Sequence, residues 1–396
     1  MLIKISKESV LIPAMLLVLL VVCWIELDLY APSFPQIMHY FNTNEQAIQW
    51  TLSLNFLGFF ITSLFCGPLA DSYGRRPVLL VGTFTFVLGS LLCVFAPNMQ
   101  VLLWGRLIQG IGVSAPVTVC ITVIADLYQG ERQMRLMSLM NSIITIVMAM
   151  APIAGVFLTE TWGWRSNFSV IAAGSLIGMG IVWLFLPETL PKEQRRSFSM
   201  GQLLKSYWIL LTHREFMLMT MSMSFIGASY FLYVGVAPLL FMEEMGVSIH
   251  QYAYYQGFVV GMFALTSFLI PTLMKHFDVI KLTKQSLVMC FVTCSGALVQ
   301  GLFFKDAPIP ITLWMGLYAV AAAVPCCVIF TQAMDLFPDL RGSASSLLQA
   351  LRMLFMSITT SIMGLIYNGF WLPASILIFL LVAAAFPAGY VTTRRR

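Results

Sequence analysis

A few charged residues lie inside long apolar stretches, where a charge is costly. Glu26 and Asp28 stand near the end of the first stretch, and Arg106 stands inside the fourth. A carboxylate within the hydrocarbon region of a membrane is a functional residue by default. An opposite charge close to the acid favours its ionised form, whereas separation of the two charges favours the protonated form. These residue types therefore indicate proton exchange inside a membrane.

The spacing of the acids limits which of them can meet Arg106. Two positions along a helix correspond to about 200°, so Glu26 and Asp28 do not share a face. Pro32 removes the backbone donor for the Asp28 carbonyl and loosens the helix beside that acid. Arg106 lies about six residues, roughly 9 Å, inside its span, a depth similar to that of Asp28. We expect Asp28 to be its partner and Glu26 to be a second candidate; a permanent structural ion pair is the alternative.

The histidines do not offer another proton carrier within the spans. His39, His213, His250 and His276 all fall in expected loops or at the ends of apolar stretches. If a side chain carries the proton, it is therefore a carboxylate.

The composition of the chain requires lipid as its solvent. Of its 396 residues, 59% are hydrophobic and 10% are charged, whereas a soluble domain is about half apolar and a quarter charged. At about 20 residues per span, the length suits twelve helices with short loops. We expect an all-α membrane protein with spans at 10–32, 46–70, 78–96, 100–126, 135–158, 167–187, 216–241, 252–274, 285–304, 309–334, 344–368 and 371–392.

The basic residues predict the orientation of these spans. Eighteen of the 22 lysines and arginines, among them Lys4, Lys7, Arg196 and 394–396, fall on one side if both termini are cytoplasmic, and only two fall on the other. Cytoplasmic loops of membrane proteins carry this excess. The net charge of +5 is thus a signal of topology, and a nucleic-acid partner is not expected.

One polar segment divides the chain into halves of six spans each. We expect an N-terminal lobe at 1–187, a cytoplasmic linker at 188–215 and a C-terminal lobe at 216–396. Within the linker, Gln202–Leu211 has the pattern of an amphipathic helix that lies on the membrane surface.

The loop between the second and third spans carries a specific motif. Residues 67–77 read GPLADSYGRRP, which resembles the signature loop of the major facilitator superfamily. The resemblance implies that fold, with twelve transmembrane helices in two pseudo-symmetric six-helix lobes and a substrate site between them. The motif residues are Gly67, Asp71, Gly74, Arg75 and Arg76.

The charges of this loop predict a gate at the cytoplasmic side. Asp71 is placed to meet the positive N-terminus of the eleventh span, near Gly342. Arg75 is placed to pair with Asp126, at the end of the fourth span. In the superfamily such a cluster latches the inner gate, although a turn that merely fixes topology explains the same residues.

Other motifs resemble one branch of that superfamily, the drug/proton antiporters of the Bcr/CflA type. The first span ends D-x-Y-x-P-x-x-P from Asp28, and the fourth reads R-x-x-Q-G from Arg106. The fifth contains Pro152 and Gly155 in a partial copy of the antiporter motif. The residue before Pro152 is Ala151 rather than glycine, which leaves the direction of transport open.

The substrate cavity is harder to assign from sequence. Polar and aromatic residues within the spans are candidates, although each is also an ordinary packing residue: Tyr30, Asn55, Gln109, Tyr230, Tyr233, Gln332, Arg352 and Met353. We expect small molecules, protons and lipid as partners and a monomer as the assembly. We expect neither a cofactor nor a metal site, and no phosphate loop, HExxH or nucleophile elbow suggests an enzyme.

These patterns together predict a proton-coupled secondary transporter. The resemblance implies export of amphipathic drugs or other small molecules across the bacterial inner membrane by alternating access. One alternative keeps the fold and carries a metabolite or a siderophore, with import as an option. Another is a membrane scaffold or receptor that transports nothing.

Overall fold

The computed structural model describes residues 11–195 and 197–392. Regular structure in this part of the chain is entirely helical, and twelve of its helices are long and apolar enough to cross a membrane. The predicted twelve-span, all-α architecture is confirmed. The basic residues Lys4, Lys7, Arg196 and 394–396, used to predict the orientation, lie outside the described residues.

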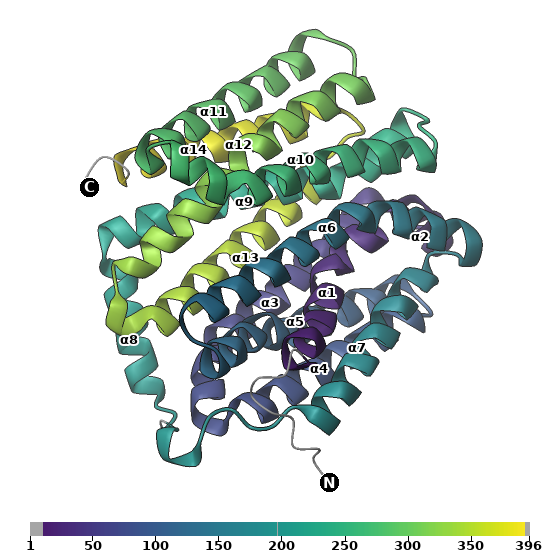
Figure 1. Ribbon diagram of the computed structural model, residues 1–396. Helices are drawn as coiled ribbons and strands as arrows, with labels where there is room; N and C mark the ends of the chain where they lie inside the picture. Colours follow the sequence, from purple (N-terminus) through teal and green to yellow (C-terminus); the bar gives the residue numbers. More distant parts are fainter. Residues whose placement is uncertain (1–10, 196, 393–396) are drawn as a thin grey trace.

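The first half of the chain forms one bundle, coloured purple to teal (Figure 1). Within it, α4 packs on α5 and α7, α1 packs on α6 and α7, and α3 packs on α5. Its elements are α1 (Leu11–Tyr30), η1 (Ala31–Ser33), α2 (Phe34–Phe41), α3 (Glu45–Tyr73), α4 (Arg75–Val94), α5 (Met99–Leu127), α6 (Gly130–Trp162) and α7 (Arg165–Phe185).

The second half forms another bundle, coloured green to yellow (Figure 1). Here α14 packs on α9 and α11, and α12 packs on α10 and α11. Its elements, with those of the connecting segment, are η2 (Lys192–Gln194), α8 (Met200–Thr212), α9 (Arg214–Pro238), η3 (Leu239–Glu244), α10 (Ile249–His276), α11 (Val279–Phe303), α12 (Pro308–Asp335), η4 (Pro338–Leu340), α13 (Arg341–Ile366) and α14 (Trp371–Thr392).

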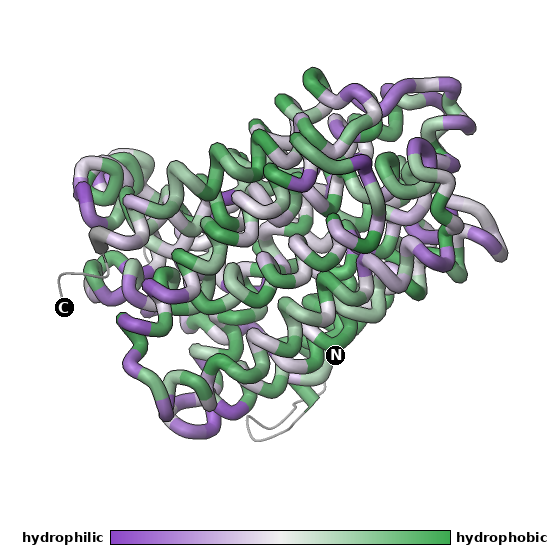
Figure 2. Tube along the Cα trace, turned by 90° about the horizontal axis from the view of Figure 1, so that it is seen from above, coloured by the Kyte–Doolittle hydropathy of each residue, from purple (hydrophilic) through white to green (hydrophobic). Residues whose placement is uncertain are grey.

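The short elements give the molecule two distinct ends. We call the end that carries α2 the α2 side and the end that carries α8 the α8 side. Polar residues gather in the loops at these ends, and apolar residues dominate the helices between them (Figure 2). The predicted amphipathic helix Gln202–Leu211 lies within α8, and Tyr207 of α8 donates a hydrogen bond of 2.5 Å to the Leu64 carbonyl of α3.

Proline interrupts the first span as expected. A 3-10 turn at Ala31–Ser33, with Pro32 in it, separates α1 from α2, because proline offers no donor to the preceding turn. The chain does not leave the bundle there, since α2 continues for eight residues to Phe41. The first span is therefore longer than the predicted 10–32.

The two bundles meet chiefly through α3 with α13 and α6 with α10. At the first contact, Ser53 of α3 donates a hydrogen bond of 2.8 Å to the Ser357 carbonyl of α13, and Ser357 returns one of 2.8 Å to the Ser53 carbonyl. Small hydroxyl residues at such a seam allow backbones to approach and satisfy one another's polar groups away from water.

Candidate functional site

The only cation buried at the centre of the first bundle, within the described residues, is Arg106. Its side chain is 0% exposed, and its Nη1 lies 3.8 Å from Glu26 Oε2. A glycine near Arg106 brings α5 close to α3. A Cβ at Gly110 would lie 1.9 Å from the Asn55 carbonyl oxygen of α3. Only glycine permits α5 and α3 to approach so closely. The pair joins α1 to α5 inside the bundle.

Polar and aromatic side chains hold the Arg106 guanidinium in place. Its Cζ lies 4.4 Å from the centre of the Tyr30 ring, and its Nε donates a hydrogen bond of 3.3 Å to the Thr51 carbonyl. Its Nη1 donates to Gln109, whose amide donates in turn to Ser90 over 2.9 Å. Three of the predicted cavity residues, Tyr30, Asn55 and Gln109, are thus brought together around Arg106.

Asn55 completes this network on the side of the acid. Its Nδ2 donates a weak hydrogen bond of 3.4 Å to the Arg106 carbonyl, and its side chain also interacts with the Glu26 carboxylate. Both Glu26 Oε2 and Arg106 Nη2 nevertheless lack a hydrogen-bond partner among the described residues. The pair is close but incompletely hydrogen-bonded.

The expected partner of Arg106 is corrected by this geometry. We expected Asp28 to meet the arginine, but Glu26 does so. The sequence-based depth of Asp28 was counted from Pro32, the predicted end of the first span. The helical path in fact continues through η1 and α2 to Phe41, so Asp28 lies deeper than that count gave. Because the two acids point in opposite directions on α1, the choice of Glu26 turns Asp28 away from α5.

Asp28 faces the second bundle. It is 3% exposed, and its Oδ1 has no hydrogen-bond partner among the described residues. Its carboxylate interacts electrostatically with Tyr230 of α9 and Tyr252 of α10. Both helices also contact η1, the turn that follows α1. Asp28 is therefore the acid that borders the interface between the bundles.

The span-5 motif lies directly beside this acid. A Cβ at Gly155 of α6 would stand 2.0 Å from the backbone oxygen of Leu29, the residue after Asp28. Pro152 lies one turn earlier on α6 and is buried. The motif thus sets how closely α6 approaches the part of α1 that carries Asp28.

The remaining cavity candidates lie in the second bundle and do not form one cluster. Tyr233 is buried beside Trp371, with ring centres 6.3 Å apart, and Met353 belongs to the hydrophobic core. Gln332 of α12 is half-buried. Arg352 of α13 has a buried Nε without a hydrogen-bond partner among the described residues.

The GPLADSYGRRP segment, predicted as a loop, is helical on both sides of Gly74, which alone separates α3 from α4, and it forms a charged cluster at the α8 side. Arg75 Nη1 donates to Asp71 over 2.5 Å, and Arg75 Nε donates to Asp126 over 3.0 Å. The expected contact of Arg75 with Asp126 is present. Among the described residues, the Asp71 side chain bonds Arg75 rather than the start of α13, although Gly67 lies close to Ser346 of that helix.

Sequence reasoning missed Glu188, which anchors this loop. Its carboxylate accepts hydrogen bonds from the backbone N–H groups of Arg75 (2.9 Å) and Arg76 (3.3 Å) at the start of α4. An acid at a helix N-terminus is stabilised by the helix dipole. Gly74 has φ +104°, and a Cβ there would lie 2.3 Å from Glu188 Oε2. The only signal in the sequence was an acid directly after the sixth span.

Two histidine–glutamate contacts across the bundles at the α2 side were also missed. His39 of α2 lies 3.0 Å from Glu243 of η3, and His250 of α10 lies 3.1 Å from Glu160 of α6. The histidines do stand at span ends, as expected. Their partners are remote in sequence, so no local pattern could have indicated the contacts.

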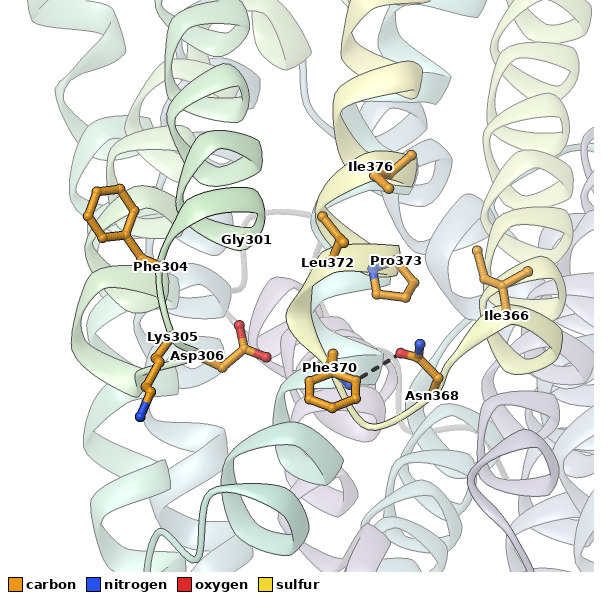
Figure 3. A pocket seen from close by; sticks show the side chains of 10 residues that line it. All are labelled: Gly301, Phe304, Lys305, Asp306, Ile366, Asn368, Phe370, Leu372, Pro373 and Ile376. Carbon is orange, nitrogen blue, oxygen red and sulfur yellow. Dashed lines mark hydrogen bonds between the residues drawn. The ribbon is translucent and has the colours of Figure 1, made fainter.

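A separate hollow of about 750 Å³ lies within the second bundle at the α2 side (Figure 3). Lys305, Asp306 and Asn368 are its polar lining residues, and Asp306 accepts a hydrogen bond of 2.8 Å from the Trp371 backbone. None of the predicted site residues lines this hollow. It is distinct from the interface that Asp28 borders.

Comparisons with known proteins agree with this architecture. The family model of the Major Facilitator Superfamily matches residues 16–360. The chain is 28% identical over 366 residues to the MFS-type transporter YdgK of Bacillus subtilis, covering 91% of this chain and 90% of the relative. It is 27% identical over 329 residues to the multidrug resistance protein MdtL of Vibrio parahaemolyticus, covering 81% and 80%.

Solved structures share the same fold at low identity. The human organic anion transporter MFSD10 superposes with a TM-score of 0.70 at 15% identity, covering 98% of this chain and 100% of that one. The xylose transporter XylE from E. coli superposes with a TM-score of 0.72 at 14% identity, covering 96% and 97%.

Proposed function

This chain belongs to the Major Facilitator Superfamily, and from that premise we propose that it exports amphipathic small molecules in exchange for protons. It is a multi-pass membrane transporter, and several of its relatives are named multidrug resistance protein MdtL. The resemblance of its motifs to the Bcr/CflA type supports the same function. The substrates are small molecules that pass between the two lobes by alternating access.

The observation that carries the proposal is the buried pair of Glu26 with Arg106, 3.8 Å apart. A carboxylate beside a guanidinium keeps its charge, and it takes up a proton when the two separate. Motion of α1 relative to α5 therefore couples protonation to the state of the transporter. Asp28, which borders the second lobe, links the same helix to the substrate site.

The two lobes are proposed to move against each other, with a smaller shift of α1 relative to α5 within the N-terminal lobe. We assign residues 1–187 to the N-terminal lobe, 188–215 to a cytoplasmic linker and 216–396 to the C-terminal lobe. The two histidine–glutamate pairs join the lobes at the α2 side. These contacts support a state closed on that side, and alternation requires both to break.

The gate is proposed to act at the opposite side. Arg75 bridges Asp71 and Asp126 at the end of three helices, and Glu188 ties the linker to the same turn. This cluster couples the position of α3, α4 and α5 to the linker between the lobes. It serves as the latch that orders the cytoplasmic ends of the helices.

The location follows from the excess of basic residues at one side. We place the protein in the bacterial inner membrane as a monomer, with the α8 side and both termini in the cytoplasm. In this orientation protons move inward as substrate moves outward. Pro152 and Gly155, beside Asp28, are the motif that supports export.

The test is transport into proteoliposomes across an imposed pH gradient, with a panel of cationic, neutral and anionic amphipathic compounds. We expect proton-dependent movement of at least one compound, abolished in Glu26→Gln. Glu131→Gln, an exposed acid at the start of α6, is the matched control and should behave as the parent protein. If, in the same assay, only an added nutrient moves, the protein is a metabolite carrier. If no compound moves, the proposal of a transporter fails and a membrane scaffold or receptor is the remaining interpretation.

A further inference from the structure

A groove of about 600 Å³ lies at the α8 side, where the linker helix meets both lobes. We call it the linker groove. Its volume falls within the range of small-molecule sites, about 300–1,000 Å³. Its walls come from three helices: Phe60 and Leu64 of α3, Leu204 and Trp208 of α8, and Leu347 and Leu351 of α13. The linker groove is thus separate from the interface that Asp28 borders.

The helix α8 carries an apolar face that the protein leaves uncovered. On one face, Leu203 and Leu210 are buried against residues of α9 and α13. On another face, Leu204, Trp208 and Leu211 follow one another at i, i+4 and i+7, and Trp208 is 69% exposed. Tryptophan and leucine on the free face of such a helix are typical of a helix at the membrane surface. The linker groove therefore opens toward lipid.

The contacts of α8 tie it to both lobes. Tyr207 donates its hydrogen bond to the Leu64 carbonyl of α3, and α8 also packs on α9 and α13. The linker groove continues the seam between α3 and α13, where Ser53 and Ser357 exchange hydrogen bonds. A molecule in the linker groove therefore touches the N-terminal lobe, the linker and the C-terminal lobe at once.

Lys205 is the one charged residue among the described residues that line the linker groove. Its side chain is exposed, and within the described part of the chain no acid forms an ion pair with it. The helix α8 itself, MGQLLKSYWILLT, contains no acidic residue. A lysine in such a position lays its methylene stem along apolar surface and keeps its ammonium group in the polar region. The linker groove thus combines apolar walls with an unneutralised cation.

An amphiphile with a negative headgroup matches both features. The leucines and Trp208 accept an acyl chain, and Lys205 attracts a phosphate group. Anionic lipids give the cytoplasmic leaflet of a membrane a negative surface that attracts basic residues beside it. A soluble anion would meet the lysine but would gain nothing from the apolar walls.

We propose that the linker groove binds an anionic phospholipid of the cytoplasmic leaflet, with an acyl chain between α3, α8 and α13 and its phosphate at Lys205. The leaflet follows from the proposed orientation. The binding itself goes beyond the proposed function, because it depends on no particular substrate. Since the lipid contacts both lobes, its binding stabilises the present arrangement of α3, α8 and α13. The lipid thereby regulates the movement of the lobes.

The experiment measures the retention of added phospholipid by the purified full-length protein in detergent, by native mass spectrometry. Phosphatidylglycerol and phosphatidylcholine with identical chains are the probes, since only the first has a net negative headgroup. We expect phosphatidylglycerol to bind more tightly. Lys205→Gln should lower its affinity about fivefold, the effect of one basic residue at an anionic surface, and Lys205→Arg should retain it. Lys192→Gln, an exposed linker residue outside the groove, is the matched control and should bind as the parent protein.

A second variant tests the groove without changing its charge. Leu204→Trp adds bulk at a position that is 60% exposed, so it fills the linker groove without crowding the core. It should lower the affinity for phosphatidylglycerol by a similar factor. Glycerol phosphate, which has the anionic group but no chains, should not displace the lipid. Equal affinity for the two phospholipids, equal retention by the parent and Lys205→Gln, or displacement by glycerol phosphate would overturn the proposal.

A melting experiment measures the stabilisation that the lipid provides. Phosphatidylglycerol should raise the melting temperature of the parent protein more than that of Lys205→Gln, because a ligand stabilises the fold that binds it. Without added lipid, the two proteins should melt alike, which shows that the variant is folded. Neither assay needs transport, so failure of the lipid site leaves the proposed exporter standing. Intact lipid binding without proton-driven movement of any compound in liposomes would reject the exporter alone.

Discussion

Arg106 pairs with Glu26 rather than with Asp28, although the two acids are only two residues apart on α1. The Nη1 atom of Arg106 lies 3.8 Å from Glu26 Oε2, whereas Asp28 interacts with tyrosines of the other lobe. One helix thus presents an acid to each of two environments. The first is a closed polar network within a lobe, and the second is the interface that must open during transport.

The first prediction concerns this pair. Glu26→Gln leaves the buried Arg106 without its counter-charge, which costs about 3–5 kcal/mol when one member of a buried pair is removed. We expect lower thermal stability in detergent and loss of proton-driven transport. Glu26→Gln combined with Arg106→Gln should recover much of the stability without recovering proton coupling. Equal stability of all three proteins would show that the two side chains do not interact.

The second prediction concerns the contact of α6 with α1. Gly155→Ala places a methyl group 2.0 Å from the Leu29 carbonyl oxygen, so the two helices must move apart beside Asp28. We expect a loss of stability on the order of 1–3 kcal/mol, as for other overpacked sites, and slower transport. Gly180→Ala, where the added group meets nothing within 4 Å, is the control and should be neutral. Similar melting temperatures for both variants would contradict the close approach.

The third prediction concerns the histidine–glutamate pairs at the α2 side. His39→Gln with His250→Gln removes both histidine–glutamate contacts between the lobes there. Exposed contacts of this kind contribute about 0.2–1 kcal/mol each, so we expect the ratio of closed to open protein to fall by about twofold to thirtyfold. Spin labels at Trp162 and Tyr254, both exposed, report the distance between the lobes. His276→Gln, at the other end of α10, should leave that distance distribution unchanged.

The fourth prediction concerns the latch at the α8 side. Arg75 donates from two different nitrogens to Asp71 and Asp126, and the single ammonium group of lysine does not reproduce this planar geometry. Arg75→Lys should therefore slow transport severalfold while substrate binding in detergent stays the same. Lys192→Arg, an exposed linker position, is the control. A parallel loss of binding would mean that the cluster shapes the substrate site instead of the gate.

The sequence by itself determined the architecture, because the relevant signals are local. The number of spans depends only on how many apolar segments are long enough to cross the membrane, whatever their neighbours in the fold. The twelve predicted spans correspond to twelve helices. The GPLADSYGRRP segment carries its own opposite charges four residues apart, so Arg75 and Asp71 meet at i and i+4. The acids within the first span were also evident, since any charge in an apolar stretch is conspicuous.

The tertiary structure alone decided which face of each helix meets which neighbour. The choice between Glu26 and Asp28 depended on the rotation of α1 and on its continuation through Pro32 into α2. The contacts of Glu188 with α4, and of Glu160 with His250, join segments far apart in the chain. Periodicity gives the faces of a helix but not the partner of each face, because that partner is set by the packing of all twelve helices together.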